Sequence, residues 1–188
     1  LIDGALTVLD SYLEKHTTDL LIFGYSVFGD NRRENDTLIL EQLKNNLDKQ
    51  MMIRTYLSTK NNLFGYIWRA VYSTEFLKKQ DIRFETSLKI SEDYLFLLQC
   101  ILYANSTLII PDELYEYHIG DSSMSIKYIP TLLNDMMWVN QWIYDHVIFF
   151  DNSLSDNYKF IVMNTYIRFV QNTLRNDTVS MRIKLRLI

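Results

Sequence analysis

The chain has 188 residues, of which 48% are hydrophobic and 14% aromatic, and its formal net charge is −4. A chain of this length and hydrophobic content can fill a substantial core, which excludes intrinsic disorder. Its acidic balance excludes a nucleic-acid binder, because neutralising phosphates requires Lys and Arg clustered over most of one face.

The cysteine count and the lengths of the apolar runs indicate the cellular setting. Cys100 is the only cysteine, so no disulfide can form within the chain, and a reducing, cytoplasmic compartment fits best. The opening residues carry no signal-peptide pattern. No apolar run approaches the roughly 18 to 20 residues that cross a bilayer, so we expect no membrane span.

The first part of the chain is predicted to contain two helices around a buried strand. Apolar residues recur at helical spacing over residues 3–15 and again over residues 40–57. Between them, Asp19 to Gly29 is rich in aromatic and branched residues, which is typical of a strand buried on both faces. The sequence GDNRREND after this strand indicates an exposed turn, and residues 62–72 are apolar without clear periodicity.

The remaining elements are predicted from their start and stop signals. The segment STEFLKK has the pattern of a helix start, and residues 80–90 follow as an irregular connection. Ser91 can serve as the N-cap of a helix that ends near Ala104. The run TLIIPDELYEYHI predicts two short strands broken at Pro111, followed by a flexible loop, GDSSMS. Residues 129–175 predict two long helices. The whole indicates a mixed α/β fold in one compact unit.

Two adjacent carboxylates, Glu92 and Asp93, open the predicted helix that follows Ser91. One interpretation is structural, since carboxylates in the first turn of a helix are stabilised by roughly 0.3–1 kcal/mol against its positive end. The other is catalytic, with one carboxylate held at a pocket as a general base toward a substrate hydroxyl. The spacing alone does not choose between them.

The residues from Trp68 to Ser125 resemble the acceptor-side half of bacterial family-2 glycosyltransferases with the GT-A fold. In that family a Trp, an "efL" segment, an "irF" segment, an acidic "ED" that opens a helix, and a Tyr-x-Tyr strand end with a basic residue and a Ser-rich loop follow in this order. The corresponding residues here are Trp68, Phe76–Leu77, Ile82–Phe84, Glu92–Asp93, Leu114–Tyr117 and His118 with Ser122–Ser125.

The resemblance implies a division of the chain. Residues 1–128 would form the acceptor-side portion of the GT-A domain, and residues 129–188 a helical extension. The family binds its nucleotide sugar in an N-terminal Rossmann-like half that ends in a DxD motif, and no D-x-D occurs in this sequence. We therefore expect that the donor-binding half is missing here and that the chain by itself is inactive.

The resemblance also implies a reaction and a cofactor. Asp93 matches the family's catalytic base, and Glu92 is the adjacent acid of the pair. A carboxylate within hydrogen-bond reach takes the proton of an acceptor hydroxyl as the oxygen attacks the anomeric carbon, which inverts the configuration. A divalent metal, Mn²⁺ or Mg²⁺, bound mainly by the absent DxD motif, would stabilise the diphosphate leaving group.

Four further residues are candidates for binding substrate, each with a simpler alternative. Trp68 can stack on a sugar ring or belong to the core, and Arg69 can contact a phosphate or acceptor or simply be solvated. His118 lies where a basic residue can contact the donor diphosphate or, as in some relatives, serve as a metal ligand, although a lone loop histidine is usually solvated. Ser123 lies in the GDSSMS loop, which can act as a lid over bound donor or be a plain loop.

Partners follow from the resemblance and from the C-terminal charge. The resemblance implies a nucleotide-sugar donor and a saccharide or lipid-linked acceptor. Residues 161–188 contain five basic residues and one acid, so this tail can lie on an anionic membrane surface at the inner face of the cell membrane. The aromatic and Met-rich helices before it can pack within one chain or against a second copy, as a homodimer.

A non-catalytic helical interaction module is the alternative from a different class. In that case Glu92 and Asp93 only stabilise a helix start, and the aromatic residues are core. No Walker loop, G-x-G-x-x-G fingerprint, G-x-S-x-G elbow or zinc-ligand spacing is present, which removes other common enzyme classes.

Overall fold

The computed structural model describes residues 1–29, 32–35, 40–41, 44, 48–58, 66–118, 128–177, 180–181 and 184–185. The first described elements are α1 (Ala5–Leu13), β1 (Leu20–Gly29), β2 (Arg32–Asn35), α3 (Lys49–Leu57), the 3₁₀ turn η2 (Ile67–Arg69) and β3 (Ala70–Tyr72). They are followed by α4 (Thr74–Lys79), α5 (Glu92–Tyr103), β4 (Thr107–His118), α6 (Leu132–Ile143), the π-helical turn η4 (Tyr144–Ile148), the 3₁₀ turn η5 (Asn152–Leu154) and α7 (Ser155–Leu174). The expected mixed α/β fold is confirmed.

Strand β1 is the centre of the sheet, because it pairs with every other described strand. The parallel strand β4 lies along one edge of β1. On the opposite edge, β3 pairs antiparallel with residues 20–22, and β2 pairs antiparallel with residues 26–29. The side chains from Leu20 to Ile22 are completely buried, so the prediction of a strand covered on both faces is confirmed.

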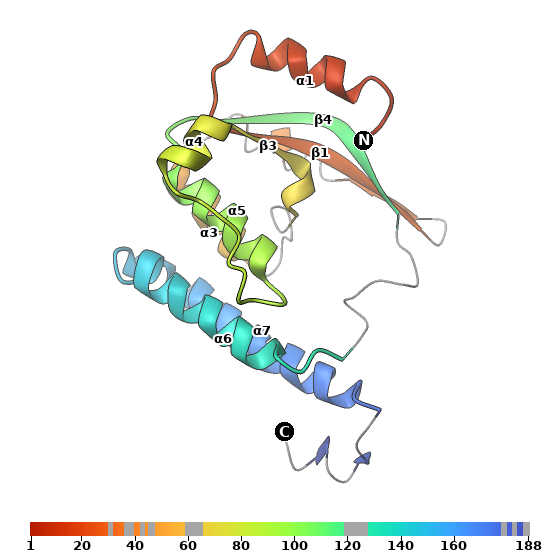
Figure 1. Cartoon of the computed structure of the whole chain (residues 1–188), viewed down its shortest axis with the longest axis vertical. Helices are drawn as coiled ribbons and strands as arrows, with labels where there is room; N and C mark the ends of the chain where they lie inside the picture. Colours follow the sequence, from red (N-terminus) through yellow and green to blue (C-terminus); the bar gives the residue numbers. More distant parts are fainter. Residues whose placement is uncertain are drawn as a thin grey trace.

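The helices form layers on the two faces of this sheet (Figure 1). Helix α1 covers one face, where Ala5 and Leu9 pack with Leu21 and Phe23. Helices α3, α4 and α5 lie on the other face, and α6 and α7 lie beyond them. A single cluster of buried residues runs from Leu20 and Ile22 of β1 through α5 to Val139 and Ile143 of α6. The helical pair thus shares its core with the sheet.

Strand β4 continues through Pro111, so the prediction of two strands broken there was wrong. The pairing with β1 is irregular at this point, where Ile22 pairs with Ile109 but Gly24 with Glu113. The extra residues of β4 bulge toward β1, and Gly24 gives them room, since a Cβ at this glycine would lie 2.8 Å from the Pro111 carbonyl oxygen. The bulge accommodates the missing N–H of proline inside a long strand.

Gly24→Ala is expected to destabilise the protein. The added methyl group would lie 2.8 Å from the Pro111 oxygen and 2.9 Å from the Asp112 oxygen, and both are backbone atoms that cannot rotate away. Overpacking of this kind costs about 1–3 kcal/mol. Urea denaturation measures the change, and Gly4→Ala is the control, since Gly4 has a positive φ but open space around its Cβ position. A larger loss at Gly4 than at Gly24 would contradict the steric explanation.

The remaining element predictions are largely confirmed. The predicted helices over residues 3–15, from Thr74, and from Glu92 to about Ala104 are present as α1, α4 and α5. The segment expected to be only a turn contains β2, which pairs with β1 because the chain folds back along its open edge. The helix expected over residues 40–57 is described fully only as α3, since most of residues 42–47 lie outside the described part of the chain.

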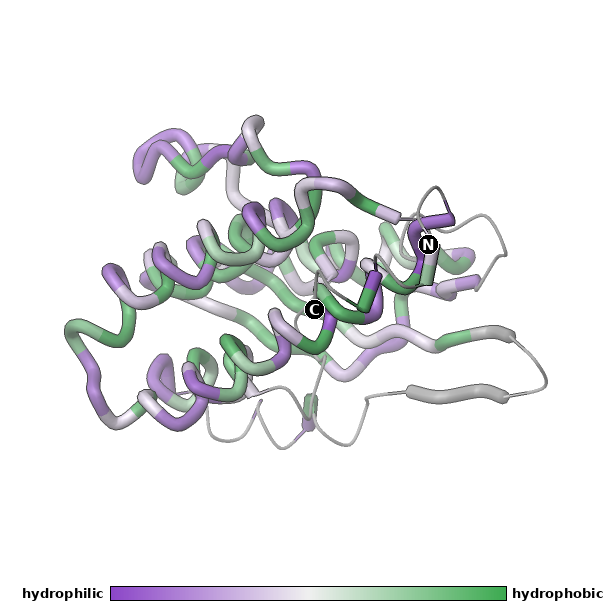
Figure 2. The backbone as a smooth tube through the Cα atoms, turned by 90° about the horizontal axis from the view of Figure 1, so that it is seen from below, coloured by the Kyte–Doolittle hydropathy of each residue, from purple (hydrophilic) through white to green (hydrophobic). Residues whose placement is uncertain are grey.

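Helices α6 and α7 pack against each other and against the layer formed by α3 and α5. Asn140 of α6 donates a hydrogen bond to the Thr165 hydroxyl of α7 over 2.9 Å, and both side chains are buried. Figure 2 shows hydrophobic and hydrophilic residues interspersed along the helices. Several large apolar side chains of this pair and of the connection between its helices are nevertheless exposed, including Trp138, Phe149, Phe150, Phe160 and Ile167.

The predicted membrane-binding tail requires basic residues that face solvent, and not all of the C-terminal basic residues do so. Lys184 is buried, and its ammonium group donates a hydrogen bond to the Leu174 carbonyl oxygen over 2.8 Å. Arg182 and Arg186 lie outside the described residues. Within the described part of the chain, no helix is both long and apolar enough to span a bilayer.

Candidate functional site

The acidic pair lies where the sequence predicts it, in the first turn of α5. Ser91 occupies the N-cap position, but its hydroxyl makes no capping hydrogen bond, and its φ of 66° places the backbone in the left-handed region. A non-glycine residue in this region costs of order 1–3 kcal/mol and is commonly found at functional sites. The turn therefore directs the chain sharply into α5 and presents Glu92 and Asp93 at its start.

Hydrogen bonds on two sides hold the start of α5 in place. On one side, the buried Asp135 carboxylate of α6 accepts from the backbone N–H of Lys89 over 3.0 Å and from the Thr131 hydroxyl over 2.8 Å. On the other side, the buried Tyr56 of α3 donates its hydroxyl to the Tyr94 carbonyl oxygen over 2.6 Å. The acidic pair is thus carried by a helix whose position is fixed by two other helices.

Asp93 opens onto a pocket of about 630 Å³ between the start of α5, the end of α3 and the pair α6 and α7. Fourteen described residues line it: Tyr56, Leu57, Ser58, Tyr66, Ser91, Asp93, Tyr94, Met136, Val139, Asn140, Ile161, Asn164, Arg168 and Gln171. The Asp93 side chain is only partly buried. Its carboxylate is accessible to a ligand, as the catalytic interpretation requires.

Burial raises the pKa of Asp93 above its usual value, and the neighbouring Glu92 carboxylate raises it further. Both effects disfavour the ionised form, because one removes water from the charge and the other repels it. A carboxylate with a raised pKa binds a proton more readily than an ordinary aspartate does, which suits a general base. The environment therefore favours a proton-accepting role.

Trp68 belongs to a cluster of aromatic rings beside the pocket. Its indole stacks on Tyr115 of β4 at a centroid distance of 4.2 Å and on Tyr66 at 4.9 Å, and it lies 5.0 Å from Tyr25 of β1 in an edge-to-face contact. Tyr117 is stacked at 5.5 Å. Because Tyr66 also lines the pocket, the cluster is continuous with the Asp93 site. Trp68 is half-buried, so its indole packs against other rings while part of its surface stays accessible. This position is compatible with both alternatives, core packing and sugar stacking.

Arg69 is not solvated, contrary to one of the two expectations for it. The side chain is 0% exposed, and its Nε and Nη2 atoms donate to the Phe23 carbonyl oxygen over 3.2 and 2.8 Å. The guanidinium also lies over the Tyr25 ring at 4.8 Å. These contacts give Arg69 a structural role in the sheet, and substrate binding by this residue stays a prediction.

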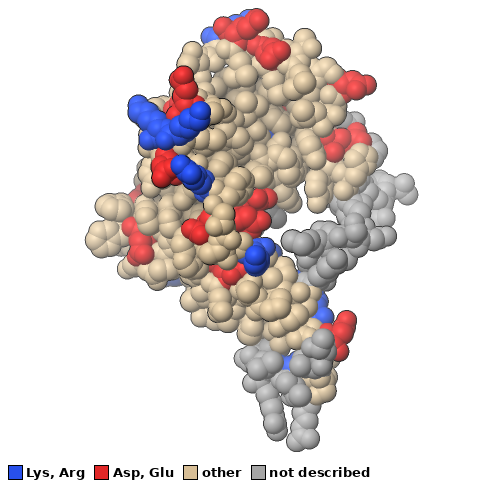
Figure 3. All heavy atoms as spheres, viewed as in Figure 1, with Lys and Arg blue, Asp and Glu red and all other residues tan. Residues whose placement is uncertain are grey.

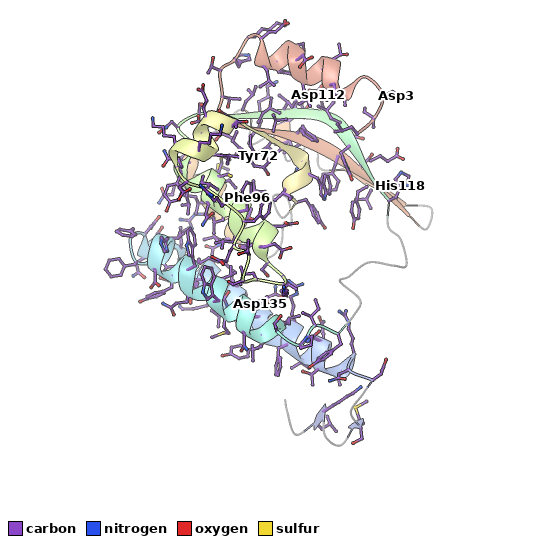
Figure 4. All side chains as sticks on the ribbon, viewed as in Figure 1. Asp3, Tyr72, Phe96, Asp112, His118 and Asp135 are labelled. Atoms are coloured by element: carbon purple, nitrogen blue, oxygen red, sulfur yellow. The ribbon has the colours of Figure 1, made fainter. Side chains whose placement is uncertain are left out.

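His118 is not among the residues that line the pocket. His118 ends β4, far from Asp135 of α6 (Figure 4), and its Nε2 lies 2.7 Å from the Glu116 carboxylate. Ser123 lies outside the described residues. Among the residues that the structure describes, no group of three His, Cys, Asp or Glu side chains could hold a metal ion. These residues therefore do not by themselves form a metal site, and His118 as a metal ligand stays a prediction.

Residues from α3 and α7 complete the pocket and were not singled out from the sequence. Ile161, Asn164, Arg168 and Gln171 are spaced by three, four and three residues, so they share one face of α7. Arg168 was counted only as part of the basic tail. Helical spacing could have grouped these residues, but it could not show that their face lines the same pocket as Asp93.

The fold is shared with a solved glycosyltransferase. Two crystal structures of Staphylococcus aureus TarS residues 1–349 are similar to this chain. One, in complex with UDP-GlcNAc, has a TM-score of 0.51 and 21% identity over 77% of this chain. The other has a TM-score of 0.54 and 16% identity over 95% of this chain. These likenesses establish the fold, and this chain spans 40% and 47% of the two TarS chains.

A sequence comparison points to the same class of protein. The chain is 34% identical over 62 residues to the succinoglycan biosynthesis protein ExoO of Rhizobium meliloti (strain 1021). The match covers 33% of this chain and 18% of ExoO. No protein-family model matches the chain. Together the comparisons confirm the resemblance to glycosyltransferases with the GT-A fold.

Proposed function

We propose that this chain is the acceptor-binding, base-bearing part of an inverting glycosyltransferase, with Asp93 as the general base. The observation that carries the proposal is the position of Asp93, which is fixed at the start of α5 and faces an accessible pocket with its pKa raised. The similarity to TarS and ExoO supports glycosyl transfer as the general activity. A role of the pair in helix stabilisation alone does not require this pocket.

The proposed step couples one proton transfer to one substitution. The ionised Asp93 carboxylate accepts the proton of an acceptor hydroxyl while that oxygen bonds to the anomeric carbon of the donor sugar. The bond from this carbon to the diphosphate oxygen breaks, and the nucleoside diphosphate leaves with the electron pair. Attack from the side opposite the leaving group inverts the anomeric configuration. Glu92 acts on this step indirectly by raising the pKa of Asp93.

The donor and the metal are proposed to be held largely outside this chain. TarS was crystallised with UDP-GlcNAc, which supports a nucleotide-sugar donor here as well. Among the described residues, no group of three His, Cys, Asp or Glu side chains could hold a metal ion. In this proposal a divalent cation, Mn²⁺ or Mg²⁺, is bound mainly by a DxD motif, as the resemblance implies. On this proposal the residues described here are inactive alone, because they supply the base but neither the donor site nor the metal ligands.

The aromatic cluster is proposed to support the acceptor. Sugars present apolar C–H faces that pack on aromatic rings, and Trp68, Tyr66 and Tyr117 place several rings beside the pocket. The acceptor is a saccharide or a lipid-linked sugar. Peripheral contact with the membrane and formation of a homodimer remain proposals, for which the exposed Phe149 and Phe150 are candidate contacts.

Glu92→Gln is expected to shift the pH dependence of transfer to lower pH. Asp93 is active as a base only when ionised, so kcat/KM falls as the pH falls through its raised pKa. Removing the Glu92 charge lowers this pKa, while burial still keeps it above the usual value. The acid limb of the kcat/KM profile, measured from about pH 4 to 8, should therefore move down in the variant.

Glu75→Gln is the matched control for this shift. It makes the same chemical change in the first turn of another helix, α4, where Glu75 is exposed and distant in sequence from Asp93. Its profile should coincide with that of the wild type. An unmoved or upward-shifted acid limb in Glu92→Gln would remove Glu92 from its proposed role.

The direct test of the function uses the full-length gene product. We expect transfer from at least one nucleotide sugar to a saccharide or lipid-linked acceptor in the presence of Mn²⁺ or Mg²⁺, with loss of transfer in EDTA. NMR of the product should show an anomeric configuration opposite to that of the donor. A product with retained configuration would rule out a single displacement assisted by Asp93.

A further inference from the structure

The pocket in front of Asp93 has a second charged wall. Asp93 of α5 and Arg168 of α7 are the only charged residues among the described residues that line it. The polar side chains of Asn164 and Gln171 lie on the same face of α7 as Arg168. The pocket therefore has an acidic side at the start of α5 and a basic, hydrogen-bonding side on α7.

The two charges do not neutralise each other. Burial and Glu92 account for the raised pKa of Asp93, and no ion pair joins Asp93 to Arg168. Within the described part of the chain, no carboxylate forms an ion pair with Arg168. Asp93 and Arg168 therefore line one pocket of about 630 Å³ without an ion pair between them, and each charge is open to a ligand in that pocket.

The surroundings of Arg168 disfavour its positive charge. Partial burial lowers the pKa of the guanidinium, and the nearby charge of Arg175 lowers it further. An arginine remains charged in proteins even so, and much of this side chain is open to solvent, so a cation accessible to a ligand lines the pocket. A bound anion would offset the repulsion by Arg175, and a guanidinium can bind a phosphate or carboxylate through two parallel hydrogen bonds.

We propose that Arg168 binds an anionic group, a phosphate or a carboxylate, of the acceptor whose hydroxyl meets Asp93. The inference rests on the proposed function, because the pocket holds the acceptor only if Asp93 is the base. Arg168 is then a determinant of acceptor specificity. Asn164 and Gln171 lie beside it and can donate further hydrogen bonds to the same group.

The structure favours the acceptor over the donor as the source of the anion. A base must lie within hydrogen-bond reach of the acceptor hydroxyl, so the space that Asp93 lines is acceptor space. A donor diphosphate placed there would bring two negative charges against the Asp93 carboxylate. The anionic group of the acceptor can instead lie against α7, across the pocket from Asp93.

The test measures binding to the full-length gene product by calorimetry at constant ionic strength. The anionic probes are glycerol 3-phosphate and glucuronate, and their neutral counterparts are glycerol and glucose. We expect at least one anionic probe to bind more tightly than its counterpart, and Arg168→Gln to weaken that binding at least tenfold. Arg168→Lys should recover only part of it, because an ammonium group lacks the planar pair of donors.

Lys159→Gln is the matched control, since Lys159 lies on the same helix but does not line the pocket and is paired with Asp156. It should leave the binding of every probe unchanged. The proposal is overturned if Arg168→Gln leaves anion binding intact, or if Lys159→Gln weakens it equally. It is also overturned if Arg168→Gln weakens binding of UDP rather than of the two acidic probes, because the guanidinium would then serve the donor.

The binding measurement separates this proposal from the proposed function. Loss of anion binding in Arg168→Gln, in a protein that transfers no sugar from any nucleotide donor, would leave the anion site standing and remove the glycosyltransferase assignment. Active transfer with no effect of Arg168→Gln on any anionic probe would leave the glycosyltransferase assignment standing and remove the anion site. In an active enzyme, Arg168→Gln should raise the KM of an anionic acceptor at least tenfold while leaving the donor KM unchanged.

Discussion

Asp93→Asn is expected to reduce kcat of the full-length gene product by about 10²–10⁴-fold, the usual contribution of a general base. Asparagine has nearly the same shape but cannot accept the hydroxyl proton. Because the geometry of the pocket is retained, the KM values for donor and acceptor should change little. Steady-state kinetics with both substrates measures this split. A variant with undiminished kcat would remove Asp93 from the mechanism.

The same variant is expected to keep or slightly raise the thermal unfolding midpoint. The pKa of Asp93 is raised in the folded protein, so ionisation at neutral pH weakens the fold, and its cost is present above the unfolded-state pKa. A neutral asparagine removes this cost. The helix-stabilising interpretation predicts the opposite. Losing a carboxylate near the positive end of α5 would reduce the free energy of unfolding by roughly 0.3–1 kcal/mol and would therefore lower the midpoint.

Asp135→Asn is the contrasting control for these two outcomes. The Asp135 carboxylate accepts from Lys89 and Thr131 and fixes the segment that leads into α5. Its replacement should lower the unfolding midpoint, with a loss of stability of about 1–2 kcal/mol. If Asp93→Asn behaved like Asp135→Asn, with lower stability and a proportionate loss of activity, Asp93 would be a structural residue.

Local patterns predicted the elements that carry the site. The apolar spacing and the Ser91, Glu92 and Asp93 sequence placed α5 within about one residue, because helix starts depend on neighbouring residues. The order of motifs predicted the class of fold, which the comparisons confirm. Pro111 misled the strand prediction, since the compensating feature is Gly24, on a different strand and far away in the sequence.

The chemistry around Asp93 depends on tertiary contacts that spacing cannot reveal. Tyr56 and Asp135 hold the start of α5 from different helices, and Arg168 reaches the pocket only because α7 packs beside α3 and α6. Acidic and basic groups are interspersed on the face shown in Figure 3. The net charge of the chain therefore could not predict where a charged pocket lies. The sequence singled out Asp93 as the candidate base but not the residues that surround it.

The burial of Arg69 follows from a gap along β1. Strand β3 pairs with residues 20–22 and β2 with residues 26–29 of the same edge, so the edge around Phe23 has no strand partner among the described residues. Arg69 directly precedes β3 and donates two hydrogen bonds to the Phe23 carbonyl oxygen there. The guanidinium thus takes the place of a strand in satisfying the backbone.

Arg69→Ala is expected to lower the free energy of unfolding by about 3 kcal/mol. The change leaves the Phe23 carbonyl without these two donors, removes the contact with the Tyr25 ring, and opens a cavity at a fully buried position. Arg69→Lys should recover less than half of the loss, since lysine cannot present two fixed donors. Denaturation in urea measures both changes.

Arg54→Ala is the control for this prediction, because Arg54 is exposed and donates a hydrogen bond to the Ser153 hydroxyl over 3.2 Å. Its loss should cost less than about 0.5 kcal/mol. A substrate-binding role for Arg69 predicts a different pattern, with stability retained in Arg69→Ala and a raised KM for donor or acceptor. Burial in the sheet makes the stability loss the expected result, because a cation without water must be held by the protein itself.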